Sequence, residues 1–237
     1  MVCILATSKI WNPALHENLE KRTSKEFISV TSPIELTANN LAKIQPEYIF
    51  FPHWSYIIPP EIFKYHECII FHMTDLPYGR GGTPLQHLIL NKANQTKISA
   101  LRCEAEIDSG PIYLKKSMTL EGKAQEIYYR ATLIIEDMIA EIIAKKLTPR
   151  PQQGTPVIFQ RRTPDQGNIV ELNELETVYN YIRMLDAEHY SAAFIETENL
   201  RFEFTDAKLG NDKISAHVTI QLKREENEKN CSNSSTS

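Results

Sequence analysis

The feature that most constrains the fold is a regular alternation, in the first half of the chain, of short apolar runs with segments of helical patterning. Four such runs are Val2–Thr7, Phe27–Thr31, Tyr48–Pro52 and Glu67–His72. A short apolar run bounded by turn residues is typical of a strand buried on both faces of a sheet. Strands that alternate with helices form crossover units, which predicts an α/β fold with a Rossmann-like, mainly parallel sheet covered by helices on both faces.

Helical patterning fills the intervals between these runs. The predicted helices are Leu15–Arg22, Ser32–Ile44, Pro59–Tyr65, Thr83–Asn91 and Glu121–Lys146. Ser32-Pro33 reads as an N-cap followed by proline at the first helical position. The segment Glu121–Lys146 carries apolar residues at helical spacing, so we expect one long helix against the sheet. Two further strands are predicted at Lys97–Glu106 and Ile112–Lys115.

The second half of the chain has a different organisation. Residues 147–167 are rich in proline, glutamine and basic side chains, which indicates the exit from a first domain. A helix at Asn173–Ala187 and two strand pairs, at Ala193–Phe204 and Ile214–Leu222, predict a small, mostly-β C-terminal module. The predicted division is a main domain at 1–150, a basic proline-rich linker at 151–168, the C-terminal module at 169–223 and a disordered tail at 224–237.

Composition narrows the range of functions. The net charge of −4 argues against a nucleic-acid partner, because phosphate binding depends on clustered Lys and Arg. The four cysteines have no close metal-site or redox spacing, so we expect buried thiols and no bound metal. The N-terminus lacks the pattern of a signal peptide, and no apolar run approaches the roughly 20 residues of a membrane span. These features predict a cytoplasmic protein.

Two segments contain residues suited to catalysis. Phe71–Leu85 (FHMTDLPYGRGGTPL) places His72 at a strand end, before a loop rich in proline and glycine, and Asp108 lies on a tight turn in EIDSGPIY. Loops at the carboxyl ends of strands are the usual ligand-binding positions of α/β sheets. A histidine with a carboxylate partner makes a general base. Taken alone, a histidine at a strand end is more often structural, and an aspartate before Ser-Gly usually belongs to a turn.

These residues resemble the catalytic domain of formyltetrahydrofolate-dependent formyltransferases, a family that includes methionyl-tRNA, glycinamide-ribonucleotide and sugar formyltransferases. His72 matches the family histidine, Leu76-Pro77 and Arg80-Gly81 match the loop after it, and Asp108-Ser109-Gly110 matches the Asp-x-Gly turn. The resemblance implies transfer of a formyl group from N10-formyltetrahydrofolate to an amine, with His72 and Asp108 as catalytic residues.

The resemblance also assigns binding segments. The folate is expected to contact Trp54, Ser55, Tyr56, Leu101, Cys103, Glu106 and Ile107. The acceptor substrate is expected to contact Thr74, Pro77, Tyr78, Arg80, Gly81, Gly82, Arg161 and Arg162. The three arginines in this set are expected to face the diphosphate of a sugar nucleotide, because a guanidinium group binds phosphate oxygens in pairs.

One position departs from the family pattern. Ile70 stands where the family has an asparagine whose amide donates a hydrogen bond to the formyl oxygen. Loss of one such donor typically lowers the rate by about 10²–10³. Three interpretations follow: another donor replaces it, with His53, Ser55 and Thr74 as candidates; His72 acts alone; or formyl transfer has been lost.

The most specific prediction from the sequence concerns the identity of the acceptor substrate. The loop DLPYGRGG and the residues around Arg161 look most like formyltransferases of bacterial surface-sugar pathways. This likeness predicts a UDP- or dTDP-linked 4-amino-deoxy sugar as acceptor in surface-glycan (lipopolysaccharide) biosynthesis, within that group the pseudaminic acid pathway. The expected partners are therefore the folate and a nucleotide sugar, and a homodimer is compatible with the sequence. The alternatives are a methionyl-tRNA formyltransferase, a catalytically silent folate or sugar-nucleotide binding protein, and a formyltetrahydrofolate hydrolase.

Overall fold

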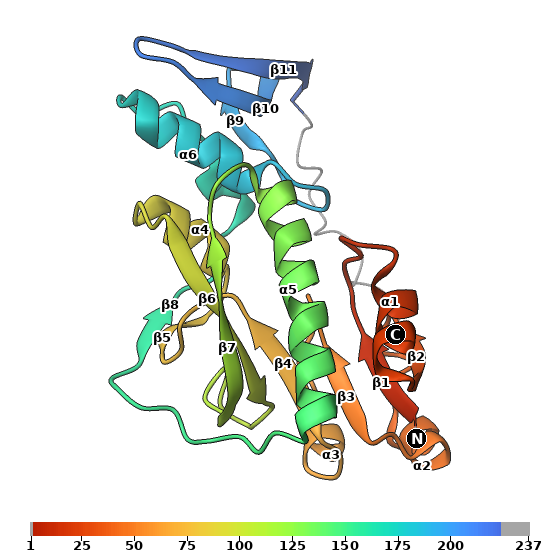
Figure 1. Cartoon of the computed structure of the whole chain (residues 1–237). Helices are drawn as coiled ribbons and strands as arrows, with labels where there is room; N and C mark the ends of the chain where they lie inside the picture. Colours follow the sequence, from red (N-terminus) through yellow and green to blue (C-terminus); the bar gives the residue numbers. More distant parts are fainter. Residues whose placement is uncertain (1, 224–237) are drawn as a thin grey trace, which may run out of the picture.

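The computed structural model describes residues 2–223, in which a large mixed sheet and a smaller C-terminal sheet are joined by helices (Figure 1). The predicted tail at 224–237 lies outside the described residues. The large sheet has six strands in the order β2-β1-β3-β4-β6-β7. These strands are β1 (Val2–Ala6), β2 (Glu26–Val30), β3 (Tyr48–Phe51), β4 (Cys68–His72), β6 (Gln95–Arg102) and β7 (Ile112–Thr119).

The sheet is mainly parallel, which confirms the predicted fold class. Strands β1 to β4 pair in parallel, whereas β6 runs antiparallel to both β4 and β7. Strands β2 and β3 lie on opposite sides of β1, so the direction of winding reverses there. The carboxyl ends of all the parallel strands meet at one edge, where ligands bind in folds of this type.

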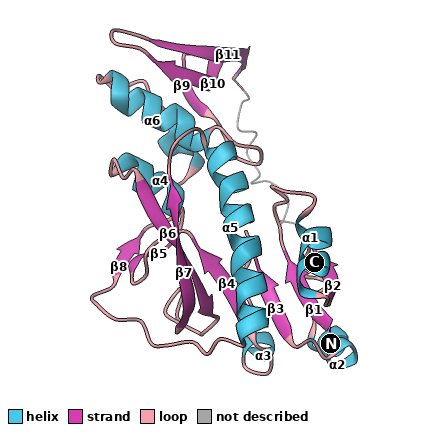
Figure 2. Ribbon diagram, in the orientation of Figure 1, coloured by secondary structure: helices cyan, strands magenta, loops and turns pink. Residues whose placement is uncertain are grey.

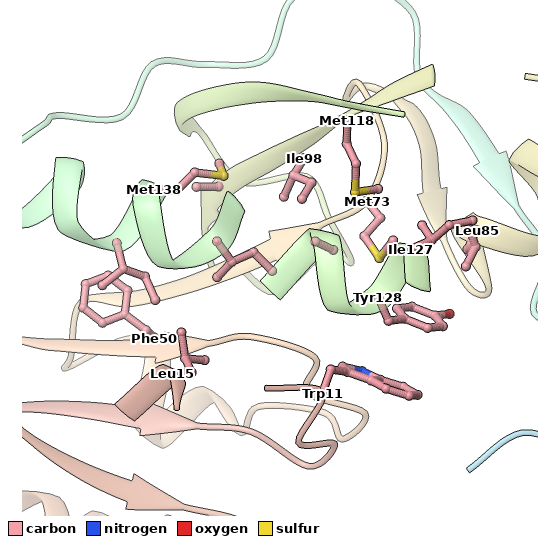
Figure 3. Packing of buried hydrophobic residues seen from close by; sticks show 14 of the residues in the cluster. Trp11, Leu15, Phe50, Met73, Leu85, Ile98, Met118, Ile127, Tyr128 and Met138 are labelled. Carbon is pink, nitrogen blue, oxygen red and sulfur yellow. The ribbon is translucent and has the colours of Figure 1, made fainter. Parts of the chain in front are cut away.

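Helices cover both faces of this sheet (Figure 2). They are α1 (Leu15–Thr23), α2 (Ala38–Ile44), α3 (Pro60–Phe63), α4 (Pro84–Leu90) and α5 (Ala124–Lys145). Residues of α1, α4 and α5 join one core cluster, in which Trp11 stacks on Tyr128 with ring centroids 4.8 Å apart (Figure 3). Residues of α2 and α3 join a second cluster on the other face.

Strand β4 contributes side chains to both clusters. Ile69 belongs to the cluster under α5, whereas Cys68 and Ile70 belong to the opposite cluster. Because side chains alternate along a strand, His72 lies on the same face as Cys68 and Ile70. Cys3, Cys68 and Cys103 are buried and unpaired, as the sequence predicted.

The predicted helix at Ser32–Ile44 is too long. Helix α2 begins only after Thr37, whose hydroxyl accepts a hydrogen bond from the Asn40 N–H. Residues 32–36 instead form a turn in which the Glu35 carboxylate accepts the Ser32 N–H. Thr37 is therefore the N-cap, because its side chain pairs a backbone donor that the helix leaves free.

The C-terminal module lies at one end of the molecule, beside α4 and the start of α5 (Figure 1). It consists of α6 (Leu175–Leu185) and the antiparallel strands β9 (Ala193–Glu196), β10 (Leu200–Leu209) and β11 (Ile214–Leu222), after the short 3₁₀ helix η1 (Pro164–Gly167). The sequence did not predict a pair of short strands, β5 (Tyr78–Gly81) and β8 (Val157–Phe159), which run parallel. Within residues 2–223, no helix is long and apolar enough to cross a membrane.

Candidate active site

His72 and Asp108 face each other at the carboxyl edge of the sheet. His72 is the last residue of β4, and Asp108 lies on the turn between β6 and β7. The distance from His72 Nδ1 to Asp108 Oδ2 is 3.4 Å, and the two side chains are only 9% and 11% exposed. The structure therefore brings together the two residues that the resemblance proposed as a catalytic pair.

The hydrogen bonding of His72 defines its tautomer. His72 Nε2 lies 2.7 Å from the Gly79 carbonyl oxygen, which can only accept, so Nε2 carries a hydrogen. The other ring nitrogen, Nδ1, faces the Asp108 carboxylate. A neutral ring would direct a lone pair at that carboxylate, whereas an imidazolium would direct an N–H at it. The carboxylate therefore accepts a hydrogen bond from this ring only when Nδ1 also carries a hydrogen.

The Asp108 carboxylate is held by its own turn and by β5. Asp108 has φ 53°, in the left-handed region that non-glycine residues enter at a cost. The Gly81 N–H donates to Asp108 Oδ2 at 2.9 Å. A side chain at Gly81 would place Cβ 2.4 Å from the Phe159 carbonyl oxygen, and its φ is +103°, so only glycine fits. The Gly81 donor therefore depends on close contact between β5 and β8.

The loop between His72 and β5 is anchored by residues that the sequence did not single out. The buried Ser99 hydroxyl donates to the Thr74 carbonyl oxygen at 2.7 Å. Lys115 forms an ion pair with Asp75 at 2.5 Å and also donates to the Leu76 carbonyl oxygen. These bonds fix the loop against β6 and β7. A polar residue inside a strand gives no sequence signal for such a role.

A second residue that the sequence missed is Gln152, from the segment after α5. Its Nε2 donates to the carbonyl oxygens of Asp108 and Gly110, and its Oε1 accepts from the Arg80 guanidinium. Arg80, predicted to contact substrate, is a buried residue that also pairs with Glu106 at 3.3 Å. No spacing or motif places Gln152 here.

The other predicted acceptor-binding residues gather around β5 and β8. The Pro77 carbonyl oxygen accepts from the Val157 N–H, and Tyr78 is partly exposed beside Phe159. Gly82 packs so closely on Arg161 that a Cβ there would lie 2.6 Å from the Arg161 Cβ. Arg161 is exposed, whereas Arg162 donates to the Gln166 carbonyl oxygen and lies over the Tyr181 ring. The structure brings these two sequence-distant segments together.

The predicted folate segment after β3 lies on the same face as His72. Trp54 packs in one cluster with Ile70 and Cys103, and its indole Nε1 is buried without a hydrogen-bond partner among the described residues. Ser55 bonds to Ser8 through both its N–H and its hydroxyl. Tyr56 is half exposed and packs edge-on against Trp54. This segment therefore presents aromatic surface next to the strand that carries His72.

The predicted folate residues near β6 divide into buried and exposed ones. Leu101 is fully buried opposite Ile70 in the sheet, so its side chain is a core residue. Burial, with the nearby charges of Asp108 and Glu104, raises the pKa of the Cys103 thiol to about 11, which makes it a poor nucleophile. Glu106 and Ile107 are exposed on the turn that leads to Asp108.

Each of the three candidate donors for the position of the asparagine replaced at Ile70 has a hydrogen-bond partner in this structure. Thr132 gives its only hydrogen to the Tyr128 carbonyl oxygen, so His53 Nε2 donates to Thr132, on the α5 face of the sheet. Thr74 donates to the Gly79 carbonyl oxygen. Ser55 is paired with Ser8, as described above. His72 Nε2 is likewise bonded, to the Gly79 carbonyl oxygen.

A wound α/β sheet with a His–Asp pair at its carboxyl edge, followed by a small antiparallel module, is the architecture of formyltransferases. A solved methionyl-tRNA formyltransferase from Clostridium thermocellum is 46% identical to this chain, with a TM-score of 0.91, and the match covers 94% of this chain and 100% of that one. The chain belongs to the formyltransferase family that contains this enzyme. A family described as "Methionyl-tRNA formyltransferase, C-terminal domain" matches residues 164–221.

Two further comparisons set the limits of this assignment. Methionyl-tRNA formyltransferase of Thermodesulfovibrio yellowstonii is 26% identical over 179 residues, and the match spans 72% of this chain but only 58% of that relative. The formyltransferase PseJ from Anoxybacillus kamchatkensis, solved with a UDP-linked formamido sugar and tetrahydrofolate, is 19% identical with a TM-score of 0.54 and shares 67% of this chain and 85% of its own. At that identity the likeness concerns the fold alone.

These comparisons correct the prediction of the acceptor. A nucleotide-linked amino sugar of surface-glycan biosynthesis, and with it the pseudaminic acid pathway, was the wrong expectation, because the similarity to the methionyl-tRNA enzyme is far greater than that to the sugar enzyme. The expectation of no nucleic-acid partner was wrong for the same reason. The loop DLPYGRGG lies beside His72 and Asp108 and outside the C-terminal module that the family model matches, so it was a poor guide to the acceptor. A net charge averages the whole surface and does not describe a local binding face.

Proposed function

We propose that this protein transfers a formyl group from N10-formyltetrahydrofolate to the α-amino group of methionyl-tRNA. The observation that carries the proposal is the 46% identity to the Clostridium thermocellum methionyl-tRNA formyltransferase across the full length of that chain. The family match over residues 164–221 supports the same acceptor, because it lies in the module outside the catalytic sheet.

The folate segments fit a flat heteroaromatic ring. Trp54 offers an aromatic surface and an unpartnered buried N–H, and Tyr56 and Ile107 add exposed apolar surface on the two loops. Apolar walls with a few polar groups are typical of cofactor sites. When bound, N10-formyltetrahydrofolate would supply an activated one-carbon unit. Trp54, Tyr56 and the turn at Glu106–Ile107 are the residues that we propose hold it.

His72 is the proposed catalytic group. The attack of an uncharged amine on a formyl carbon builds negative charge on the formyl oxygen, and an imidazolium N–H can stabilise that charge. His72 Nε2 carries a hydrogen and must release the Gly79 carbonyl oxygen to reach a substrate. The new bond joins the amine nitrogen to the formyl carbon, the bond from that carbon to N10 breaks, and the proton lost by the amine passes to N10.

Asp108 is the proposed electrostatic partner of His72. The carboxylate lies 3.4 Å from Nδ1 and is itself held by the Gly81 N–H. Ile70 supplies no amide to the formyl oxygen, so His72 Nε2 is the principal donor in this proposal. A charged donor compensates in part for the missing neutral one, because charge-assisted hydrogen bonds are about twice as strong.

The proposed tRNA face lies beside β5 and β8. Arg161 is exposed next to Gly82, on the segment that leads from the catalytic sheet to the C-terminal module. Arg162 follows it in the chain, and the Arg162 guanidinium lies over the ring of Tyr181 in α6. Guanidinium groups at this position can bind the phosphates of an acceptor stem, although the chain as a whole is acidic.

The test is a formylation assay on the purified protein with N10-formyltetrahydrofolate and charged methionyl-tRNA. Mass spectrometry of the released amino acid should show formylmethionine, and a His72→Ala variant should not produce it. Folate binding without turnover would replace the proposal with a silent binding protein. Release of formate without any acceptor would indicate a hydrolase.

A further inference from the structure

The side-chain amide of Gln152 uses all of its hydrogen-bonding capacity inside the site. Its Nε2 donates to the carbonyl oxygens of Asp108 at 2.7 Å and Gly110 at 2.9 Å. Its Oε1 accepts from Arg80 Nε at 3.2 Å and Arg80 Nη2 at 2.9 Å. A primary amide offers two hydrogens and two lone pairs, so no part of this group remains for a substrate.

The orientation of this amide is determined by its partners. Two carbonyl oxygens can only accept, and a guanidinium can only donate. Rotation of the amide by half a turn would place Oε1 of Gln152 against the two carbonyl oxygens and Nε2 against Arg80. Gln152 therefore holds its neighbours in one arrangement, unlike an amide that can pair equally well in either sense.

The turn that Gln152 holds is strained and tightly packed. Asp108 adopts φ 53°, and a Cβ on Gly110 would lie 1.9 Å from the Arg102 carbonyl oxygen. Strained backbone persists only where the surroundings hold it in place. Because the Asp108 side chain starts from this turn, a shift of the turn moves the carboxylate relative to His72.

Gln152 also holds the segment that binds the carboxylate from the other side. Arg80 has a side chain only 10% exposed, and its other partner, Glu106, is 75% exposed. Arg80 directly precedes Gly81, whose N–H donates to Asp108 Oδ2. Loss of the Gln152 oxygen would leave a buried guanidinium short of acceptors, which carries a large penalty. One amide thus links the turn that carries the carboxylate to the strand that binds it.

The position of Gln152 is itself fixed by backbone pairing. The N–H groups of Ile112 and Arg150 bond to each other's carbonyl oxygens at 2.7 and 2.9 Å. This bridge ties the chain two residues before Gln152 to the start of β7. The following residue, Gln153, is exposed and offers a matched control.

From these contacts we infer that Gln152 is a positioning residue, which sets the Asp108 carboxylate against His72 Nδ1 through the Asp108 turn and Arg80. It acts without touching substrate. The kinetic part of its test rests on the proposed function, whereas the spectroscopic part does not.

The experiment compares Gln152→Met, which has similar volume and no amide, with Gln153→Met in the full chain. Formylation of methionyl-tRNA gives kcat and KM, and NMR reports the imidazole signals of His72, assigned with the His72→Ala variant. We expect Gln152→Met to lower kcat by about 10- to 100-fold, with KM changed by less than about threefold, since small misplacements of reacting groups have effects of that size. The His72 signals should move in the same sense as in Asp108→Asn, and Gln153→Met should match the wild type.

A Gln152→Met variant with the kcat and His72 signals of Gln153→Met would overturn the inference. So would a lower kcat with unchanged His72 signals, because that result describes a general loss of stability. If Gln152→Met does not fold, Gln152→Glu applies the same two criteria, since it keeps an acceptor for Arg80 and removes only the two donors. A wild type that is inactive on methionyl-tRNA refutes the proposed function, and the His72 signals then still decide the role of Gln152.

Discussion

Replacement of Asp108 by asparagine should separate folding from catalysis. The Asn oxygen can take the place of Asp108 Oδ2, where it still accepts the Gly81 N–H and still faces His72 Nδ1. The variant therefore keeps both contacts of this oxygen and removes only the negative charge of the carboxylate beside the ring. Because the Gly81 bond is kept, the melting temperature should fall by no more than about 4 °C.

The size of the effect follows from the distance between the two groups. Two unit charges 3.4 Å apart attract by roughly 5 kcal/mol at an effective dielectric constant of about 20. The retained Gly81 bond and residual solvent screening reduce the loss, and each 1.36 kcal/mol corresponds to a tenfold change in rate. We therefore expect kcat to fall by about 10²–10³, as for other lost charge stabilisation in active sites.

The assay is single-turnover formylation of methionyl-tRNA at saturating formyl donor, with Asp165→Asn as control. Asp165 is an exposed residue of η1 to which we assign no part in the site, so Asp165→Asn should have the kcat of the wild type. An Asp108→Asn protein that folds normally and retains kcat within about threefold would refute the proposed electrostatic role of this carboxylate.

Three further outcomes are expected. If the acceptor is tRNA, the logarithm of its KM should rise linearly with the logarithm of the salt concentration, with a slope of about one per phosphate contact. A KM that does not change with salt in steady-state kinetics would exclude a tRNA acceptor. Gly81→Ala should lower the free energy of unfolding by at least about 2 kcal/mol, because Gly81 has a positive φ and an added Cβ would contact Phe159. In the control Gly210→Ala, the nearest atom to the added Cβ lies 3.3 Å away, so the free energy of unfolding should change less. Equal urea midpoints for the two variants would contradict this prediction. Burial, with the nearby Lys9 charge, lowers the pKa of His53 to about 3, so the unfolded chain binds the extra proton below about pH 6.5, and stability should fall by about 2 kcal/mol from pH 7 to 5. His53→Gln should lose less over that range in urea titrations, and an equal loss would count against this assignment.

The sequence predicted best what depends on local pattern. Apolar runs such as Tyr48–Pro52 became strands of a parallel sheet, and the helical spacing of Glu121–Lys146 became α5. The start of α2 was misplaced because Ser32-Pro33 satisfies the same local rules as Thr37, but in the structure it is the Thr37 hydroxyl that accepts a backbone N–H of the helix. The pairing of β5 with β8 left no local pattern, since it joins residues far apart in the chain.

The sequence by itself determined the fold class and identified His72 and Asp108 as candidates, because periodicity and short motifs are properties of neighbouring residues. It did not determine the acceptor, since the loop after His72 pointed to a sugar enzyme while the whole chain is far more similar to a methionyl-tRNA enzyme. The tertiary structure decided that the two residues meet at 3.4 Å, that Gly79 binds Nε2, and that Gln152 connects Asp108 to Arg80. Such contacts join residues tens of positions apart, and their geometry exists only after the chain has packed.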